Sequence, residues 1–341
     1  MKTELINSFL SKLPEICIRN SNSQEFSYWK IGGPVALLVE PQSIAQLATS
    51  IRLIHEHPND AGIVIGDGSN LLFDSAGFNG VIVKIGNGLS KYTIEGTKMR
   101  CEAGLWVPEL AYRLSELGLS GIEHICGIPG RIGGLVYMNG GSNRRSILEN
   151  TISVELINSA GEIETVYATD LEYAYRTSPF QNDGRIVAAV TLQLEKDTRK
   201  AVRSRIKAIL ESRRKKFPRK LPNCGSVFLS DPAMYDQIGP PGFAIEKVGL
   251  KGLSKGHAQL SPIHANFIVN NGGAKSADVL YLIALARSKV FEDTKFIMDC
   301  EARYISPDGE IVQAHKIADE QFSELYSNTF FEELSKSETH V

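Results

Sequence analysis

Apolar and polar residues recur along the first part of the chain in a pattern that predicts helices and short buried strands in turn. The opening MKTELINSFLSKLP predicts a helix before Pro14. Ser43 can cap a second helix, whose apolar face would be formed at helical spacing by Ile44, Leu47, Ile51 and Ile54. Short apolar runs predict strands at residues 35–40, 63–65 and 81–85. This alternation is typical of an α/β arrangement.

From about Gly86 the pattern changes, and we expect a second domain here. A helix at residues 107–117 should end at Gly118. Two apolar runs, at residues 152–157 and 163–166, flank a Ser-Ala-Gly turn and predict a β-hairpin. Further strands are predicted at residues 98–102 and 186–194.

Residues 196–220 hold 12 of the 37 basic side chains in one helical run. Val202, Ile206, Ile209 and Leu210 form its apolar face, while the charges spread over the rest, which favours a solvated helix between domains. The alternative is attraction of an anionic nucleotide, which salt would screen beyond about 8–10 Å. A nucleic-acid site is less favoured, because only Phe217 could stack on a base.

Beyond Pro222 the pattern predicts a third unit. Its expected strands lie at residues 224–229, 265–270 and 299–305, the last followed by a Pro-Asp-Gly turn at 307–309. Its expected helices lie at residues 243–248 and 276–290. The polar stretch at 318–341 predicts a peripheral helix with a frayed end.

Two glycine-rich stretches stand out from these elements. GDGSNLLF at residues 66–73 follows an apolar run, and GIEHICGIPGRIGGLVYMNGGSN occupies residues 121–143. Such a density of glycine is usual where φ is positive or where a ligand lies against bare backbone. A pair of tight turns is the plainer interpretation. Two loops that present several backbone N–H groups also suit a diphosphate, although the spacing matches neither a dinucleotide-binding fingerprint nor a P-loop.

Composition narrows the class of protein. A chain of 341 residues predicts two or three domains, and 43% hydrophobic with 22% charged residues is ordinary for a globular protein. The formal charge of −2 gives no field that would recruit nucleic acid. No segment approaches about 20 apolar residues, so we expect no membrane span, and the start does not resemble a secretory signal, so we expect a cytoplasmic protein.

The cysteines argue against a metal site. Cys17, Cys101, Cys126, Cys224 and Cys300 are odd in number and widely spaced, with no C-x-x-C. This spacing favours buried free thiols over a disulfide framework or a zinc site. A nucleophilic role for Cys224 is disfavoured as well, because no His/Asp partnership is detectable near it.

The two glycine loops resemble the FAD-binding loops of the UDP-N-acetylenolpyruvoylglucosamine reductases of peptidoglycan synthesis, also called UDP-N-acetylmuramate dehydrogenases. Further matching motifs follow in family order: IGG at 31–33, YRTSPFQ at 175–181, CGSVF at 224–228, GLKG at 249–252, HANFIVN at 264–270 and CEARYIS at 300–306. The resemblance implies an α+β, multi-domain FAD-binding fold of the vanillyl-alcohol-oxidase/PCMH type with a C-terminal α+β substrate domain. The implied segments are 1–86 and 87–218 for FAD, 219–306 for substrate and 307–341 as a C-terminal extension.

The resemblance also implies roles for individual residues. Arg176 would hold the substrate carboxylate, Ser226 would supply a proton, and Glu301 would stabilise the intermediate beside the arginine. The substrate would also meet Tyr175 and Gly225. FAD would be bound by Gly66, Gly68, Ser69, Asn70, Leu71, Gly127, Ile128, Pro129, Gly130, Ile132, Gly133, Asn139 and Gly140.

The implied reaction reduces UDP-N-acetylglucosamine enolpyruvate with NADPH through FAD, in two half-reactions at one site. A monomer is expected, of the subtype that lacks an extra tyrosine-bearing loop. Two alternatives stay open: a flavoprotein of this family with another substrate, and a non-catalytic nucleotide-binding protein. Ser261 and His264 resemble a structural pair of the family.

Several positions depart from the family pattern, and they concentrate at the ligand loops. Arg131 stands where a small Ser or Thr is usual, and Arg144 and Arg145 stand in place of glycines. The segment 229–231 is one residue longer and lacks a lysine. Charged side chains in a glycine loop can displace a cofactor or add a phosphate contact, and the sequence does not decide between these outcomes.

Overall fold

The computed structural model describes residues 3–181 and 183–338, the last two of them by backbone only. The chain forms two compact units. Unit 1 consists of Met1–Ser21, Val35–Asp67 and Gly80–Lys215, and unit 2 consists of Asn22–Pro34, Gly68–Asn79 and Lys216–Val341. The four segments expected from the sequence stay a prediction.

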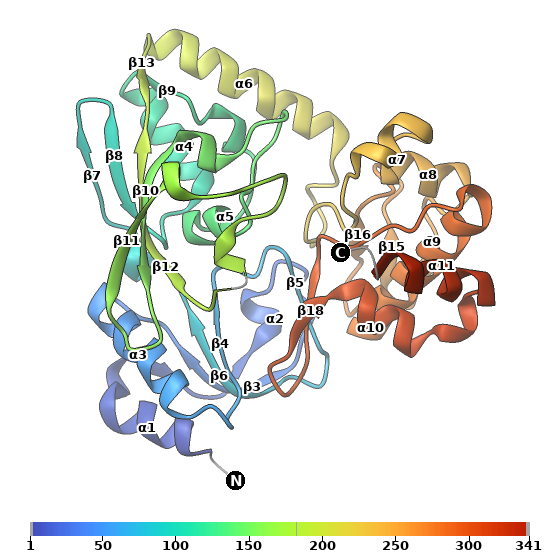
Figure 1. The fold of residues 1–341 in the computed structure, drawn as a ribbon, viewed down its shortest axis with the longest axis horizontal. Helices are drawn as coiled ribbons and strands as arrows, with labels where there is room; N and C mark the ends of the chain where they lie inside the picture. Colours follow the sequence, from blue (N-terminus) through green and yellow to red (C-terminus); the bar gives the residue numbers. More distant parts are fainter. Residues whose placement is uncertain (1–2, 182, 339–341) are drawn as a thin grey trace. The chain divides into compact units, whose positions relative to one another are not determined.

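The first part of unit 1 is a small sheet with two helices. The strand order is β1-β3-β6-β4, and β4 runs parallel to β6. A fifth strand, β2 (Ser21–Asn22), also pairs with β3. Figure 1 shows α1 beside α3. The Ser43 hydroxyl accepts a hydrogen bond from the Gln46 N–H at 3.3 Å, which confirms the predicted cap of α3. The elements are α1 (Glu4–Lys12), β1 (Cys17–Ile18), β3 (Pro34–Val39), α3 (Ile44–Glu56), β4 (Gly62–Ile65) and β6 (Phe78–Lys84).

The second part of unit 1 is an antiparallel sheet of order β11-β10-β12-β8-β7, which includes the predicted hairpin. Helix α4 ends before Gly118, whose φ is 66°. A two-stranded ladder joins β13 to β9. The elements are β7 (Tyr92–Glu95), β8 (Lys98–Glu102), α4 (Val107–Glu116), β9 (Leu119–Ser120), α5 (Ile132–Tyr137), β10 (Thr151–Ile157), β11 (Ile163–Tyr167), β12 (Ile186–Gln193) and β13 (Glu195–Lys196).

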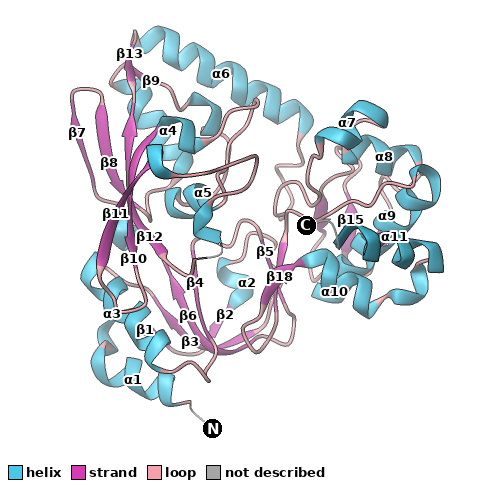
Figure 2. Cartoon of the chain, in the orientation of Figure 1, coloured by secondary structure: helices cyan, strands magenta, loops and turns pink. Residues whose placement is uncertain are grey.

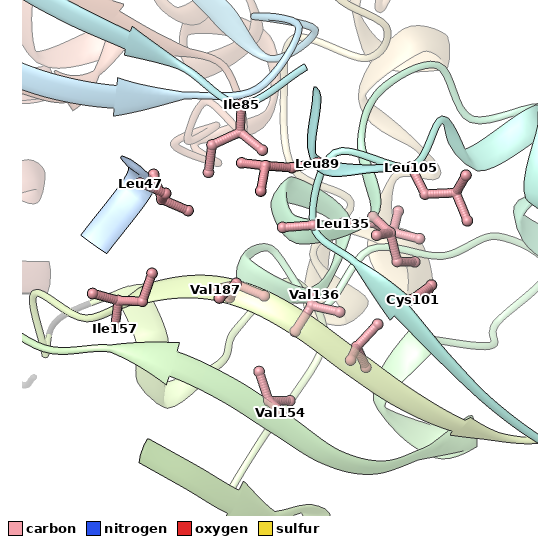
Figure 3. Packing of buried hydrophobic residues seen from close by; sticks show 14 of the residues in the cluster. Leu47, Ile85, Leu89, Cys101, Leu105, Leu135, Val136, Val154, Ile157 and Val187 are labelled. Carbon is pink, nitrogen blue, oxygen red and sulfur yellow. The ribbon is translucent and has the colours of Figure 1, made fainter. Parts of the chain in front are cut away.

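The core of unit 1 fixes the helix of the second glycine loop. Figure 3 shows Leu135 and Val136 of α5 in one cluster with Val154 of β10 and Val187 of β12. These side chains are all at most 7% exposed. Their burial holds α5 against the sheet, because each apolar side chain removed from water contributes about 1.5–3 kcal/mol.

The basic helix is α6 (Arg199–Lys216). Val202 and Ile206 are buried and pack with Ala111 and Cys126 of the same unit, as the predicted apolar face requires. Most of its charged side chains are exposed. A location between domains stays a prediction.

Unit 2 is built around the long helix α9 (Ser276–Thr294), and Figure 2 distinguishes its helices from its short strands. One three-stranded sheet has the order β14-β15-β16, and another has β18-β17-β5, in which β5 runs parallel to β17. The remaining elements are α2 (Ser23–Phe26), β5 (Leu71–Phe73), α7 (Pro232–Gln237), α8 (Pro241–Lys247), β14 (Ser254–Lys255), β15 (Ala258–Leu260), β16 (Ile268–Asn270), β17 (Arg303–Ile305), β18 (Ile311–Gln313), α10 (Ala314–Gln321) and α11 (Asn328–Glu338).

Two predictions for unit 2 were wrong. Residues 224–229 form no regular strand, because Gly225 has a φ of 89° and only Phe228 makes an isolated bridge, with Cys300. The C-terminal stretch is two helices, α10 and α11, and not one peripheral helix, since Phe330 is 0% exposed. The predicted strands at 265–270 and 299–305 are shorter in the structure, and the helix at 276–290 is longer. The expected frayed end at 339–341 lies outside the described residues.

Candidate active site

The first glycine loop connects β4 to β5. Gly68 adopts a φ of 64°, a conformation that glycine reaches without the steric cost other residues meet. Among the described residues, the N–H groups of Gly66, Asp67, Gly68, Ser69 and Asn70 donate to no protein acceptor. Leu71 then begins β5. Five successive unsatisfied donors make this loop suited to an anion.

The second glycine loop begins at Gly127 and leads through Ile128, Pro129 and Gly130 into α5. The N–H groups of Ile132 and Gly133 donate to the carbonyls of Leu105 and Ala103, at 3.0 and 2.9 Å. This backbone contact requires Gly133, because a Cβ there would lie 2.7 Å from the Ala103 Cβ. Gly134, in contrast, is exposed, and a Cβ built there would have no atom within 4 Å. The loop is therefore tight on its sheet side and open at Gly134.

Arg131 pairs with the first glycine loop. Its Nε donates to Asp67 Oδ1 at 2.8 Å, and its Nη1 donates to Asn87 Oδ1 and to the Gly104 carbonyl, at 2.6 and 2.8 Å. A Cβ on Gly66 would lie 3.5 Å from the Arg131 Cβ, so the two loops are close here. Through these contacts the Arg131 side chain joins the second glycine loop to Asp67 of the first.

The other two loop arginines face water. Arg144 and Arg145 are exposed, and Arg144 has a φ of 60°. Arg145 Nε lies 3.4 Å from Glu149 Oε2, an exposed ion pair of small energetic value.

The turn that carries Tyr175 and Arg176 is tied to the end of the second glycine loop. Ala174 and Thr177 exchange backbone hydrogen bonds at 3.2 and 3.1 Å around this turn. Asn139, 1% exposed, donates through Nδ2 to the Ala174 carbonyl at 2.8 Å. Its neighbour Gly140 is also buried. The structure thus brings the predicted cofactor residue Asn139 next to the predicted substrate turn.

Arg176 is held in a strained conformation. Its φ is 57°, which costs a non-glycine residue roughly 1–2 kcal/mol. The guanidinium lies 5.1 Å from the centre of the Tyr175 ring, and its Nη2 donates to the Gly141 carbonyl at 3.1 Å. Tyr175 itself is 55% exposed. Strained residues are concentrated at functional sites, so the backbone of Arg176 supports this turn as part of a functional site.

Ser226 and Glu301 lie on neighbouring segments of unit 2. The Glu301 N–H donates at 2.8 Å to the carbonyl of Val227, the residue that follows Ser226. Both Gly225 and Ser226 are half-buried. The Ser226 hydroxyl has no hydrogen-bond partner among the described residues. Asn70 Nδ2 donates to the Glu301 carbonyl at 2.9 Å. Two predicted catalytic residues and one predicted cofactor residue therefore converge, whereas Arg176 belongs to unit 1.

The remaining reactive side chains of this region are structural. Burial raises the pKa of the Cys224 thiol, with a contribution from the Glu301 charge, so the thiol stays protonated and is not a nucleophile. The Ser261 hydroxyl accepts from the N–H groups of Ile263 and His264, at 3.1 and 3.4 Å. His264 Nδ1 in turn accepts from the Asn266 N–H. These contacts support the structural interpretation of the pair.

The donor set fits an FAD diphosphate. The open N–H groups at residues 66–70 form a surface on which a diphosphate can lie. Sequence reasoning missed Asp67, Asn87 and Gly104 as the partners of Arg131. An arginine within a glycine loop was the available signal, but its partners lie far away in the chain.

The chain is similar to known proteins over most of its length. A family model for the UDP-N-acetylenolpyruvoylglucosamine reductase C-terminal domain matches residues 217–305, and an FAD binding domain model matches residues 35–167. UDP-N-acetylenolpyruvoylglucosamine reductase 1 of Corynebacterium glutamicum is 45% identical over 89% of this chain and 90% of that protein. The reductase of Carboxydothermus hydrogenoformans is 35% identical over 88% of this chain and 98% of that protein.

Solved structures agree with these relatives. The structure of the UDP-N-acetylenolpyruvylglucosamine reductase of Thermus caldophilus matches with a TM-score of 0.71 and 27% identity, over 84% of this chain and 97% of that chain. The predicted α+β fold, an FAD-binding domain with a C-terminal substrate domain, is confirmed. The chain belongs to the UDP-N-acetylenolpyruvoylglucosamine reductase family.

Proposed function

We propose that this chain reduces UDP-N-acetylglucosamine enolpyruvate to UDP-N-acetylmuramate with NADPH, as a step of peptidoglycan synthesis. The observation that carries the proposal is the hydrogen bond from the Glu301 N–H to the Val227 carbonyl, because it brings the segments that carry Glu301 and Ser226 together in a chain of this family. FAD, when bound, would pass a hydride from NADPH to the methylene carbon of the enolpyruvyl group.

The glycine loops would hold the cofactor. The free N–H groups of residues 66–70 would donate to its diphosphate, and the backbone from Gly127 to Gly134 would lie along it. Arg131, through Asp67, would keep the first loop in place without contacting the diphosphate itself.

Three side chains would act on the substrate. The planar guanidinium of Arg176 suits a bidentate contact with the enolpyruvyl carboxylate, where negative charge develops. The Ser226 hydroxyl, which has no partner among the described residues, would deliver a proton to the carbon next to the carboxylate. Glu301 would stabilise the intermediate beside the arginine, and Tyr175 with Gly225 would line the substrate pocket.

The proposed location, oligomeric state and subtype rest on the sequence. We infer a cytoplasmic monomer of the subtype without the extra tyrosine loop. No helix within residues 3–181 and 183–338 has both the length and the apolar character needed to cross a membrane.

The substitution Ser226→Ala tests the proposed roles. It removes the hydroxyl and leaves the glycine loops intact, so NADPH should reduce the bound FAD at nearly the wild-type rate. Reoxidation by UDP-N-acetylglucosamine enolpyruvate should slow by about 10²-fold or more, as expected for loss of a general acid. Stopped-flow absorbance measures both steps, and equal loss of both would contradict the assignment of Ser226.

A further inference from the structure

Helix α10 belongs to a C-terminal extension that lies beyond the family match at residues 217–305. The first two residues of α10 and the residue before them, Gln313, contact the backbone on both sides of Glu301. His315 Nδ1 accepts a hydrogen bond from the Cys300 N–H at 3.0 Å, and Gln313 Nε2 donates to the Cys300 carbonyl at 3.2 Å. The Ala314 N–H donates to the Ala302 carbonyl at 2.9 Å. The extension therefore makes hydrogen bonds with the backbone of the two residues that flank Glu301, Cys300 and Ala302.

A buried ion pair fixes α10 in this place. Arg287 of α9 is 0% exposed, and its Nε and Nη2 donate to the two carboxylate oxygens of Asp319 at 3.0 and 2.9 Å. The Arg287 Nη1 also donates to the Met298 carbonyl, and the Tyr326 hydroxyl donates to Asp319. A bidentate arginine–carboxylate pair fixes direction as well as distance. The helix and the segment before Glu301 are thus held by one side chain.

His315 accepts from Cys300 because its imidazole is neutral. Burial and the Arg287 charge lower the pKa of His315 to about 2. Asp299 Oδ1 lies 3.6 Å from Nε2 and favours the charged form, but it is 53% exposed and is outweighed by burial. A neutral ring with its proton on Nε2 leaves the Nδ1 lone pair for the Cys300 N–H.

We propose that α10 positions Glu301, with His315 and Gln313 as positioning residues that set the backbone on which the carboxylate is carried. This inference rests on the proposed role of Glu301. Displacement of a reacting group by about 1 Å can lower a rate by 10²-fold, so loss of one of these bonds should slow the step in which Glu301 acts and spare cofactor binding.

The test compares His315→Leu with His315→Asn in the full chain loaded with FAD. Leucine removes the acceptor, whereas the asparagine oxygen can take the place of Nδ1. Reoxidation by UDP-N-acetylglucosamine enolpyruvate should be about tenfold slower with leucine and within about twofold of wild type with asparagine. FAD content and reduction by NADPH should be unchanged in both. Glu320→Gln, at an exposed position of α10, is the matched control.

Combination with Glu301→Gln separates positioning from general damage. If His315 acts through Glu301, His315→Leu should add almost no further slowing in the Glu301→Gln background, and amide exchange at Cys300 should rise. Equal slowing in both backgrounds would overturn the inference. If His315→Leu fails to fold, the same reoxidation rates are measured for Gln313→Ala, alone and combined with Glu301→Gln. If Glu301→Gln slows reoxidation and neither α10 variant does, the inference fails alone; if Glu301→Gln has no effect, the proposed role of Glu301 fails with it.

Discussion

Arg131 and Asp67 lie 64 residues apart in the chain and form a 2.8 Å ion pair between the two glycine loops. Both side chains are nearly buried, at 12% and 13% exposure. The two glycine loops are therefore joined by a charge pair.

Arg131→Ser should weaken FAD binding and leave the fold intact. The change leaves the Asp67 carboxylate without its partner near the loop N–H groups, where its charge would oppose a diphosphate. We expect the FAD dissociation constant to rise about tenfold or more, equivalent to at least ~1.4 kcal/mol. Fluorescence titration of the apoprotein with FAD measures it.

The paired control for this prediction is Asp67→Asn combined with Arg131→Ser, which removes both charges. It should bind FAD more tightly than Arg131→Ser alone. Arg113→Ser breaks an exposed ion pair on α4 and should leave FAD affinity unchanged. An FAD affinity that does not respond to Arg131→Ser would show that the pair does not serve the cofactor loop.

Arg176→Gly should be more stable than Arg176→Ala by about 1 kcal/mol, because position 176 has a φ of 57°. Both variants lose the contacts with the Tyr175 ring and the Gly141 carbonyl, so these losses cancel in the comparison. Urea denaturation measures the difference. Both should also lose the substrate-dependent half-reaction, and equal stability of the two variants would mean that the turn relaxes without strain.

Acid should destabilise the wild-type protein more than His315→Asn. The folded protein keeps His315 neutral down to a pKa of about 2, whereas the unfolded chain takes up a proton below about 6.5. Because the unfolded state binds more protons, this histidine's contribution is complete above pH 6.5 and is lost as the pH falls, by about 2 kcal/mol at pH 5. Urea denaturation at pH 7.5 and 5 should show this difference between the two proteins, and parallel losses would argue against a neutral buried ring.

Phe330→Ala should lower the free energy of unfolding by about 3–5 kcal/mol. The ring is 0% exposed and lies 5.2 Å from the Phe291 ring, centre to centre. The neighbouring Phe331 is 38% exposed, so Phe331→Ala should cost about 1 kcal/mol or less. Denaturation of both variants checks this, and similar small losses would indicate that α11 is not part of the folded unit.

Local sequence signals were sufficient to predict much of the secondary structure. Ser43 caps its helix as predicted, and the hairpin around the turn at 159–161 has the expected pairing, because caps and tight turns depend on neighbouring residues. The resemblance directed attention to Ser226 and Glu301, whose segments the structure places side by side. Their chemical roles stay predictions.

Long-range contacts were not predictable from local pattern. The segment at 224–229 has the residues of a strand, but its only bridge is made across the chain to Cys300. The stretch at 318–341 is polar on average, which conceals the buried aromatic ring of Phe330. The partner of Arg131 and the contact of His315 with Cys300 likewise require the folded chain.

The most direct measurement is an anaerobic absorption titration of the purified protein. We expect oxidised flavin bands that bleach with NADPH and return when UDP-N-acetylglucosamine enolpyruvate is added, with UDP-N-acetylmuramate as the product. Bleaching without return would contradict the proposed substrate. A colourless protein that does not take up FAD would contradict the assignment of the glycine loops and, with it, the proposed function.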